Sequence, residues 1–280
     1  MNMNEQKKKL CAVILMFAVC AGMLYMSVLK AEVRKPEDTF LIMENAAGDV
    51  VKRLAEGINC EPHVIKDFEV IYQLPQLQTG CEVTALTMVL NHYGYDVSKT
   101  TLARDYLPKT SYRLSYKGGK AYGPDLDKVF VGNPFGDGTI CGPEAVVTTA
   151  NAYLADWEAG VFAENPDKAE AVPNRKMQAK DITGTTPAGL YFRVSNGQPV
   201  IVHVTIGMAN REEVLGWYTD TGKYVDWSLK DHGSVLIGWD EESVTIACPL
   251  AGIQTYSRER FEEIYELRGL RASVLEPVSE

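Results

Sequence analysis

Hydrophobic and polar positions follow a helical period between Thr79 and Gly94, and the rest of the chain is organised around this segment. Thr79 and Glu82 have the spacing of a capping box, which predicts that the helix begins here. Gly94 is the expected stop. The apolar positions that share one face are Val83, Leu86 and Leu90, widened by Ala85, Met88 and Val89. The pattern therefore predicts a mostly buried helix with Cys81 in its first turn.

Further along the chain, strand patterns replace helical ones. Helices are expected from Ser98, from Pro143, and over 187–194 and 258–267. Strands are expected over 64–72, 199–205, 217–218 with 224–227, 232–239 with 243–247, and 271–275. Residues 108–139 are rich in Gly, Pro and Tyr and are expected to form a long loop, which in a compact domain is usually functional or disordered. Since helices come first and antiparallel strands later, the predicted fold class is α+β.

The N-terminus combines a basic tip with a long apolar run. Three lysines at 7–9 precede an uncharged segment over 10–29, whose length is near the roughly 20 residues that span a bilayer. The lysines are expected to stay cytoplasmic, which sends the following chain outside. The prediction is a cytoplasmic tip (1–9), a transmembrane signal anchor (10–29), a stalk or lead-in (30–62) and a folded extracytoplasmic domain (63–280).

Other interpretations of this run remain open. A cleaved signal peptide has the same basic and apolar regions and would make the protein secreted, although residues 29–31 fit a small-x-small cleavage site poorly. Lipoprotein processing at Cys20 conflicts with Val19 before it. A buried helix of a soluble core is the third alternative. The anchor makes the preferred prediction a single-pass protein of the cell membrane.

Composition limits the remaining choices. The 280 residues carry a net charge of −9, which argues against a nucleic-acid partner because that would need a basic face. Six cysteines show no CxxC metal pattern, so no metal is expected. An exported domain can form disulfides, but the spacing gives no pairing.

Cys81 is the candidate nucleophile. Free N–H groups and the dipole at a helix N-terminus favour a thiolate, and Gly80 is expected to leave open space beside the sulfur. The alternative is a buried cysteine with a structural role and no catalytic one. Cys141 is a rival nucleophile because Gly142 and Pro143 begin a helix just after it, but it lacks the glutamine and capping-box context of Cys81.

A cysteine hydrolase also needs a histidine, and the chain has four. His63 lies in a loop context. His92 is at the far end of the Cys81 helix, roughly 16 Å away at 1.5 Å per residue. His203 lies in an apolar strand and fits a satisfied core histidine. His232 opens a strand after a loop, where it is expected to be exposed yet held, and is the candidate base.

Four blocks of sequence resemble the bacterial cysteine peptidases of the family-thirty-nine-like group, relatives of the bacteriocin leader peptidases. The blocks are 72–94, 130–143, 197–205 and 231–240 with 248–252, within a match over roughly 64–276. The resemblance implies a papain-like fold, with an N-terminal helix carrying the cysteine and an antiparallel sheet carrying the histidine. It also implies that Cys81 is the nucleophile, His232 the general base and acid, and Gln73 the oxyanion donor. Gln76 and Gln78 are closer in sequence and remain alternatives for that donor.

One departure from the family falls on the third member of the site. The group usually has Asp-Pro where this chain has Cys248 and Pro249. A hairpin turning at residues 240–242 is expected to bring position 248 close to His232, where the Asp would accept the ring N–H. Cysteine is a weak acceptor, so Asp240 or a main-chain carbonyl is an alternative partner. Position 203 is often aromatic in the group and is His here.

These features predict a membrane-anchored, extracytoplasmic cysteine peptidase. Attack by Cys81 on a peptide carbonyl would give a thioester that water hydrolyses, without cofactor or metal. The expected partners are a peptide or protein substrate and the membrane. The alternative of another class is a catalytically inactive papain-like module that binds peptide or cell-wall ligands, supported by Cys248. A third option is the same chemistry on a non-peptide amide.

Overall fold

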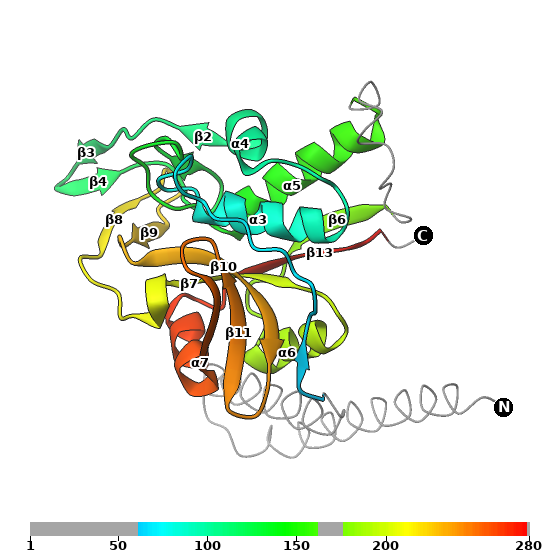
Figure 1. Ribbon diagram of the computed structural model, residues 1–280. Coiled ribbons are helices and arrows are strands. Elements are labelled where there is room, and N and C mark those ends of the chain that lie inside the picture. Colours follow the sequence, from blue (N-terminus) through cyan, green and yellow to red (C-terminus); the bar gives the residue numbers. More distant parts are fainter. Residues whose placement is uncertain (1–60, 162–175, 279–280) are drawn as a thin grey trace, which may run out of the picture. The chain divides into compact units, whose positions relative to one another are not determined.

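The computed structural model describes residues 61–161 and 176–278 (Figure 1). They belong to one compact unit, Cys60–Glu280. The predicted tip (1–9), anchor (10–29) and nearly all of the stalk (30–62) lie outside the described residues. Within the described part of the chain, no helix is both long and apolar enough to cross a membrane.

An antiparallel sheet forms the centre of the unit. Its strand order is β12-β11-β10-β7-β13-β6, and β1 also pairs with β10. The strands are β1 (His63–Val64), β6 (Met177–Asp181), β7 (Val200–Thr205), β10 (Asp231–Trp239), β11 (Ser243–Cys248), β12 (Gly252–Ser257) and β13 (Ala272–Pro277). Every residue of β7 and β10 is buried, so these strands form the middle of the core.

Helices cover both sides of this sheet. Figure 1 shows α3 (Cys81–His92) and α5 (Pro143–Glu158) on one side, and α6 (Pro187–Ser195) and α7 (Arg258–Leu267) on the other. Three shorter helices are α4 (Lys99–Thr101), the π-helix η1 (Leu102–Tyr106) and the 3₁₀ helix η3 (Ile206–Met208). The arrangement is a mixed α/β fold in which the Cys81 helix packs on the strand that carries His232.

Residues 108–139 contain short strands where a loop was expected. They are β2 (Lys109–Thr110), β3 (Ser115–Lys117), β4 (Lys120–Tyr122) and β5 (Phe130–Val131). A second sheet joins β3 and β4 to the predicted hairpin, β8 (Leu215–Tyr218) and β9 (Tyr224–Trp227). The buried Trp217 indole donates to the Pro124 carbonyl at 2.7 Å. The loop prediction was wrong: β2 pairs with β5 and β3 with β4 within this segment, and β4 also pairs with β8, nearly 100 residues later.

The ends of α3 agree only in part with the sequence pattern. Gly94 has φ +89° just beyond the helix, as a C′ glycine should. The capping box is absent: Gly80 is the N-cap and no side chain caps the helix. The Thr79 hydroxyl instead donates to main-chain oxygens of Asn133 and Gly136, at 3.3 and 3.1 Å. Thr79 therefore ties the start of α3 to the segment around residue 135. The strand expected over 64–72 is reduced to β1.

Candidate active site

Cys81 is the first residue of α3, where β10 packs against the helix N-terminus. A Cβ added to Gly233 of β10 would lie 2.8 Å from the Glu82 Cα, so only glycine permits this approach. The space at Gly80 is also filled, because a Cβ there would lie 2.9 Å from the Leu77 side chain. The open space expected beside the sulfur is absent, and Cys81 is 6% exposed.

The Cys81 thiol is held in its neutral form. It donates to the Glu82 Oε2 atom at 3.2 Å. Burial raises the pKa of Cys81 above its usual range, the Glu82 charge adds to this, and the main-chain N–H of Gly233 opposes it. The sequence argument predicted a lowered pKa from the helix N-terminus, and it was wrong for this state because desolvation of the sulfur raises the pKa of Cys81.

Glu82 is a buried acid beside the candidate nucleophile. Burial raises its pKa to about 7, and Asp231 adds to this, while hydrogen bonds from the Cys81 thiol and from main-chain N–H groups lower it. The sequence pattern gave Glu82 only a capping role, which it does not have. An acidic residue directly after a cysteine, within an otherwise apolar helical face, was the signal that could have drawn attention to it.

His232 contacts the residue that occupies the position of the usual aspartate. Its Nε2 atom lies 3.2 Å from the Cys248 Sγ. The β10–β11 hairpin brings the two together through the pairing of Val235 with Ala247, which confirms the predicted hairpin. Asp240 is not the partner, because its carboxylate accepts from the main-chain N–H groups of Glu242 and Ser243 within the turn.

The His232 ring is buried rather than exposed as expected. Burial lowers its pKa to about 4, so the imidazole is neutral near pH 7. Among the described residues, the Nδ1 atom makes no hydrogen bond, and neither ring nitrogen is bonded to the Cys81 thiol. Hydrogen bonds of a catalytic site are often long in the free enzyme and tighten with substrate.

Gln73 is the one buried residue among the three candidate glutamines. Its main-chain N–H donates to the Pro249 carbonyl at 2.9 Å, which places it beside Cys248. Its side-chain Nε2 donates to the Gln78 carbonyl at 3.2 Å, and its Oε1 is buried without a partner in the described chain. The exposed Gln78 side chain bonds to the Pro75 carbonyl. The three glutamines thus differ in burial, and the main chain of Gln73 is bonded to Pro249, the neighbour of Cys248.

Of the other candidates, Cys141 borders this arrangement, because its main-chain N–H donates to the Glu82 carboxylate. His63 is in β1 and His92 is the last residue of α3. His203 is in the core as expected, but its Nε2 has no partner among the described residues, and burial lowers its pKa to about 3. Cys141 is buried, and its pKa is raised by burial and by Glu82. No group of three or more His, Cys, Asp or Glu in the described ranges is arranged to hold a metal.

A buried ion-pair cluster that the sequence did not reveal anchors the start of β10. The Asp231 side chain is fully buried directly before His232. The Arg211 guanidinium donates to both of its oxygens at 2.9 Å, and the main-chain N–H of Ser228 donates at 2.9 Å. The Arg268 Nε lies 3.2 Å from the same carboxylate. The position of His232 is therefore fixed by arginines more than 20 residues away on either side.

The raised pKa of Glu82 predicts a stability that falls as pH rises. The folded chain keeps this proton up to about pH 7, whereas the unfolded chain releases it near 4.5. Unfolding therefore releases a proton between these values. Relative to Glu82→Gln, the wild-type free energy of unfolding should fall by about 2–4 kcal/mol from pH 4.5 to pH 8. Urea denaturation at several pH values measures this fall in the free energy of unfolding. Glu144→Gln, at an exposed site in α5, is the control; an identical pH trend in Glu82→Gln and wild type would contradict the assignment.

The sequence and the structure of the chain are similar to those of known proteins. The chain is 27% identical over 205 residues to the uncharacterized protein YvpB of Bacillus subtilis (strain 168), covering 72% of this chain and 71% of YvpB. A Bacillus anthracis crystal structure that bears the description C39-like peptidase matches with a TM-score of 0.63 and 30% identity, covering 79% of this chain and 100% of that one. The sequence model of the Peptidase_C39 like family matches residues 65–273. The chain thus belongs to the Peptidase_C39 like family and carries a cysteine peptidase-like module.

Proposed function

We propose that this protein is a papain-like cysteine peptidase in which Cys81 is the nucleophile and His232 the general base and acid. The observation that carries the proposal is the seat of Cys81 at the start of α3, where its sulfur faces the main-chain N–H of Gly233, the neighbour of His232. A fixed sulfur at a helix N-terminus, covered by the strand that carries a histidine, fits acyl transfer to a thiol.

The proposed reaction starts from a neutral pair. Because burial raises the pKa of Cys81 and lowers that of His232 to about 4, a preformed thiolate–imidazolium pair is disfavoured. His232 would accept the thiol proton as the sulfur bonds to the substrate carbonyl carbon, and would pass it to the leaving amine. Water would then hydrolyse the thioester. The main-chain N–H of Cys81 and the Gln73 amide are the proposed donors to the oxyanion.

We also propose that the catalytic unit lies outside the cell, anchored by residues 10–29. The support is the sequence alone: three lysines followed by an apolar run of membrane-spanning length. The substrate would then be a peptide or protein outside the cytoplasm.

A second candidate is a catalytically inactive module that binds a peptide or a cell-wall ligand. Two observations favour it. Cys248 occupies the aspartate position and offers His232 only a weak acceptor. The Cys81 thiol is bonded to Glu82 rather than to the imidazole.

An electrophilic peptide probe separates the two candidates. The full-length protein would be treated with a peptidyl chloromethyl ketone and the modified cysteine located by mass spectrometry. A peptidase should form the adduct on Cys81, and His232→Ala should slow it at least about 10-fold, within the range that a general base contributes. Cys141→Ser is the matched control and should react like wild type. An unmodified Cys81, or a rate indifferent to His232→Ala, would favour the inactive module.

A further inference from the structure

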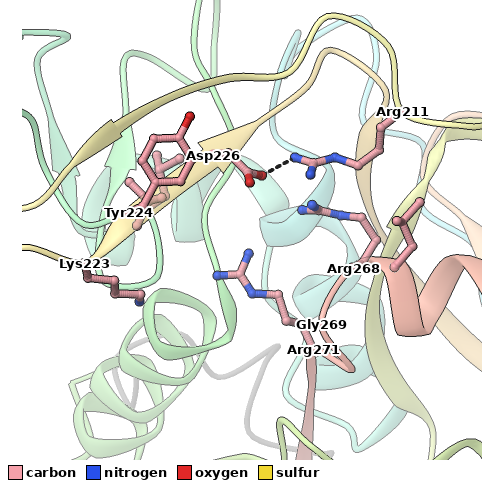
Figure 2. Close-up of a pocket in the computed structure, with 10 residues that line it drawn as sticks. Arg211, Lys223, Tyr224, Asp226, Arg268, Gly269 and Arg271 are labelled. Carbon is pink, nitrogen blue, oxygen red and sulfur yellow. Dashed lines mark hydrogen bonds and ion pairs between the residues drawn. The ribbon is translucent and has the colours of Figure 1, made fainter. Parts of the chain in front are cut away.

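A pocket of about 210 Å³ lies between the β8–β9 hairpin and the turn that follows α7 (Figure 2). Four cationic side chains line it, from three separate parts of the chain: Arg211, Lys223, Arg268 and Arg271. Asp226 is the one carboxylate in its lining, and it is bonded to the Arg211 Nη2 at 2.6 Å. The lining therefore has a clear excess of positive charge.

Arg268 is the strongest indication that the pocket has a ligand. Its side chain is 4% exposed, and its one ion pair in the described chain joins Nε to Asp231. That carboxylate also accepts two hydrogen bonds from Arg211, which has a second carboxylate partner in Asp226, whereas Asp231 is the one ion-pair partner of Arg268 in the described chain. The Arg268 Nη groups make no hydrogen bond to a described residue, and Figure 2 shows the guanidinium between Arg211 and Arg271. Burial lowers the pKa of Arg268, because the neighbouring carboxylates compensate the buried positive charge only in part.

On the opposite wall, two cations pair with two carboxylates. Arg271 and Lys223 both pair with Asp127, and Lys223 also lies 3.3 Å from Asp125. Burial lowers the pKa of Arg271 as well. Both pairing carboxylates lie outside the pocket lining. Arg271 therefore offers the pocket the guanidinium N–H groups other than Nη2, which pairs with Asp127.

We propose that this pocket binds a small oxyanion of phosphate size, either free phosphate or the phosphoryl group of a larger molecule. Guanidinium groups donate two parallel hydrogen bonds to an oxyanion, and such charge-assisted bonds are about twice as strong as neutral ones. The volume of about 210 Å³ is many times the roughly 10–15 Å³ that one water needs on this measure, which leaves room for a tetrahedral anion and some solvent. The site is separate from Cys81, and the inference does not depend on the proposed peptidase activity.

Isothermal titration of the full-length protein with inorganic phosphate, at constant ionic strength, tests the inference. We expect a saturable 1:1 isotherm that Arg271→Gln weakens at least 10-fold. Arg268→Gln should weaken it further, with circular dichroism to verify that the variant is folded. Arg104→Gln, which removes one positive charge from a site 64% exposed in η1, is the control and should bind like wild type.

Two results would overturn the proposal: no saturable heat with wild type, or equal affinities for Arg271→Gln and Arg104→Gln. Repeating the titration with glycerol phosphate distinguishes free phosphate from the phosphoryl group of a larger molecule. Tighter binding of the monoester than of inorganic phosphate indicates that a larger phosphorylated molecule is recognised, and weaker binding indicates the free anion.

Discussion

Replacing Cys248 with aspartate is expected to raise the alkylation rate of Cys81 at pH 7 by about 10- to 100-fold, the rate equivalent of a 1.5–3 kcal/mol hydrogen bond to a charged group. The His232 Nε2 lies 3.2 Å from the Cys248 sulfur, which is a weak acceptor. A carboxylate there would accept the ring N–H and stabilise the imidazolium. The thiolate–imidazolium pair that burial disfavours would become more populated. Iodoacetamide labelling with the site mapped by mass spectrometry measures the rate.

A pH profile separates this effect from a change in packing. The aspartate should raise the pKa of His232 from about 4, so the acidic limb of the labelling profile should move to higher pH. Cys248→Ser, an uncharged replacement of similar size, should leave that limb in place. If the folded Cys248→Asp protein labels no faster than wild type, the neighbour of His232 does not limit the reactivity of Cys81.

The hydrophobic pattern predicted the helices and hairpins whose residues lie close together in the sequence. Helix α7 was expected over 258–267 and is observed as Arg258–Leu267. The β10–β11 hairpin was also expected, and it brings Cys248 to His232. The strands β3 and β4 form a hairpin around Gly118 and Gly119, and this local turn signal was overlooked; only the further pairing of β4 with β8, about 100 residues later, leaves no local trace. Strand β12 was also missed; its exposed and buried positions alternate only once the hairpin with β11 is formed.

The residues of the site were easier to predict than its electrostatics. The position of Cys81 at the start of a helix and the contact of position 248 with His232 follow from spacing, and both are observed. The pKa of Cys81 is raised, where the sequence argument predicted a lowered value, because β10 covers the end of the helix closely. The sequence does not specify this packing. The roles of Glu82 and Asp231 were missed for the same reason: each is defined by burial against residues distant in the chain.

Replacing Asp231 with asparagine is expected to reduce the free energy of unfolding by about 3–5 kcal/mol, because removing one partner of a buried pair leaves the other charge uncompensated. Here two guanidinium groups lose their shared carboxylate, and the Arg268 side chain is only 4% exposed. Asp226→Asn is the matched control: it removes a carboxylate from the same Arg211, but its side chain is 35% exposed, so the cost should be about 1 kcal/mol or less. Equal midpoints of urea denaturation for the two variants would contradict the role of Asp231. A larger loss for Asp231→Asn would mean that the start of β10, and with it the backbone that carries His232, depends on this one buried charge.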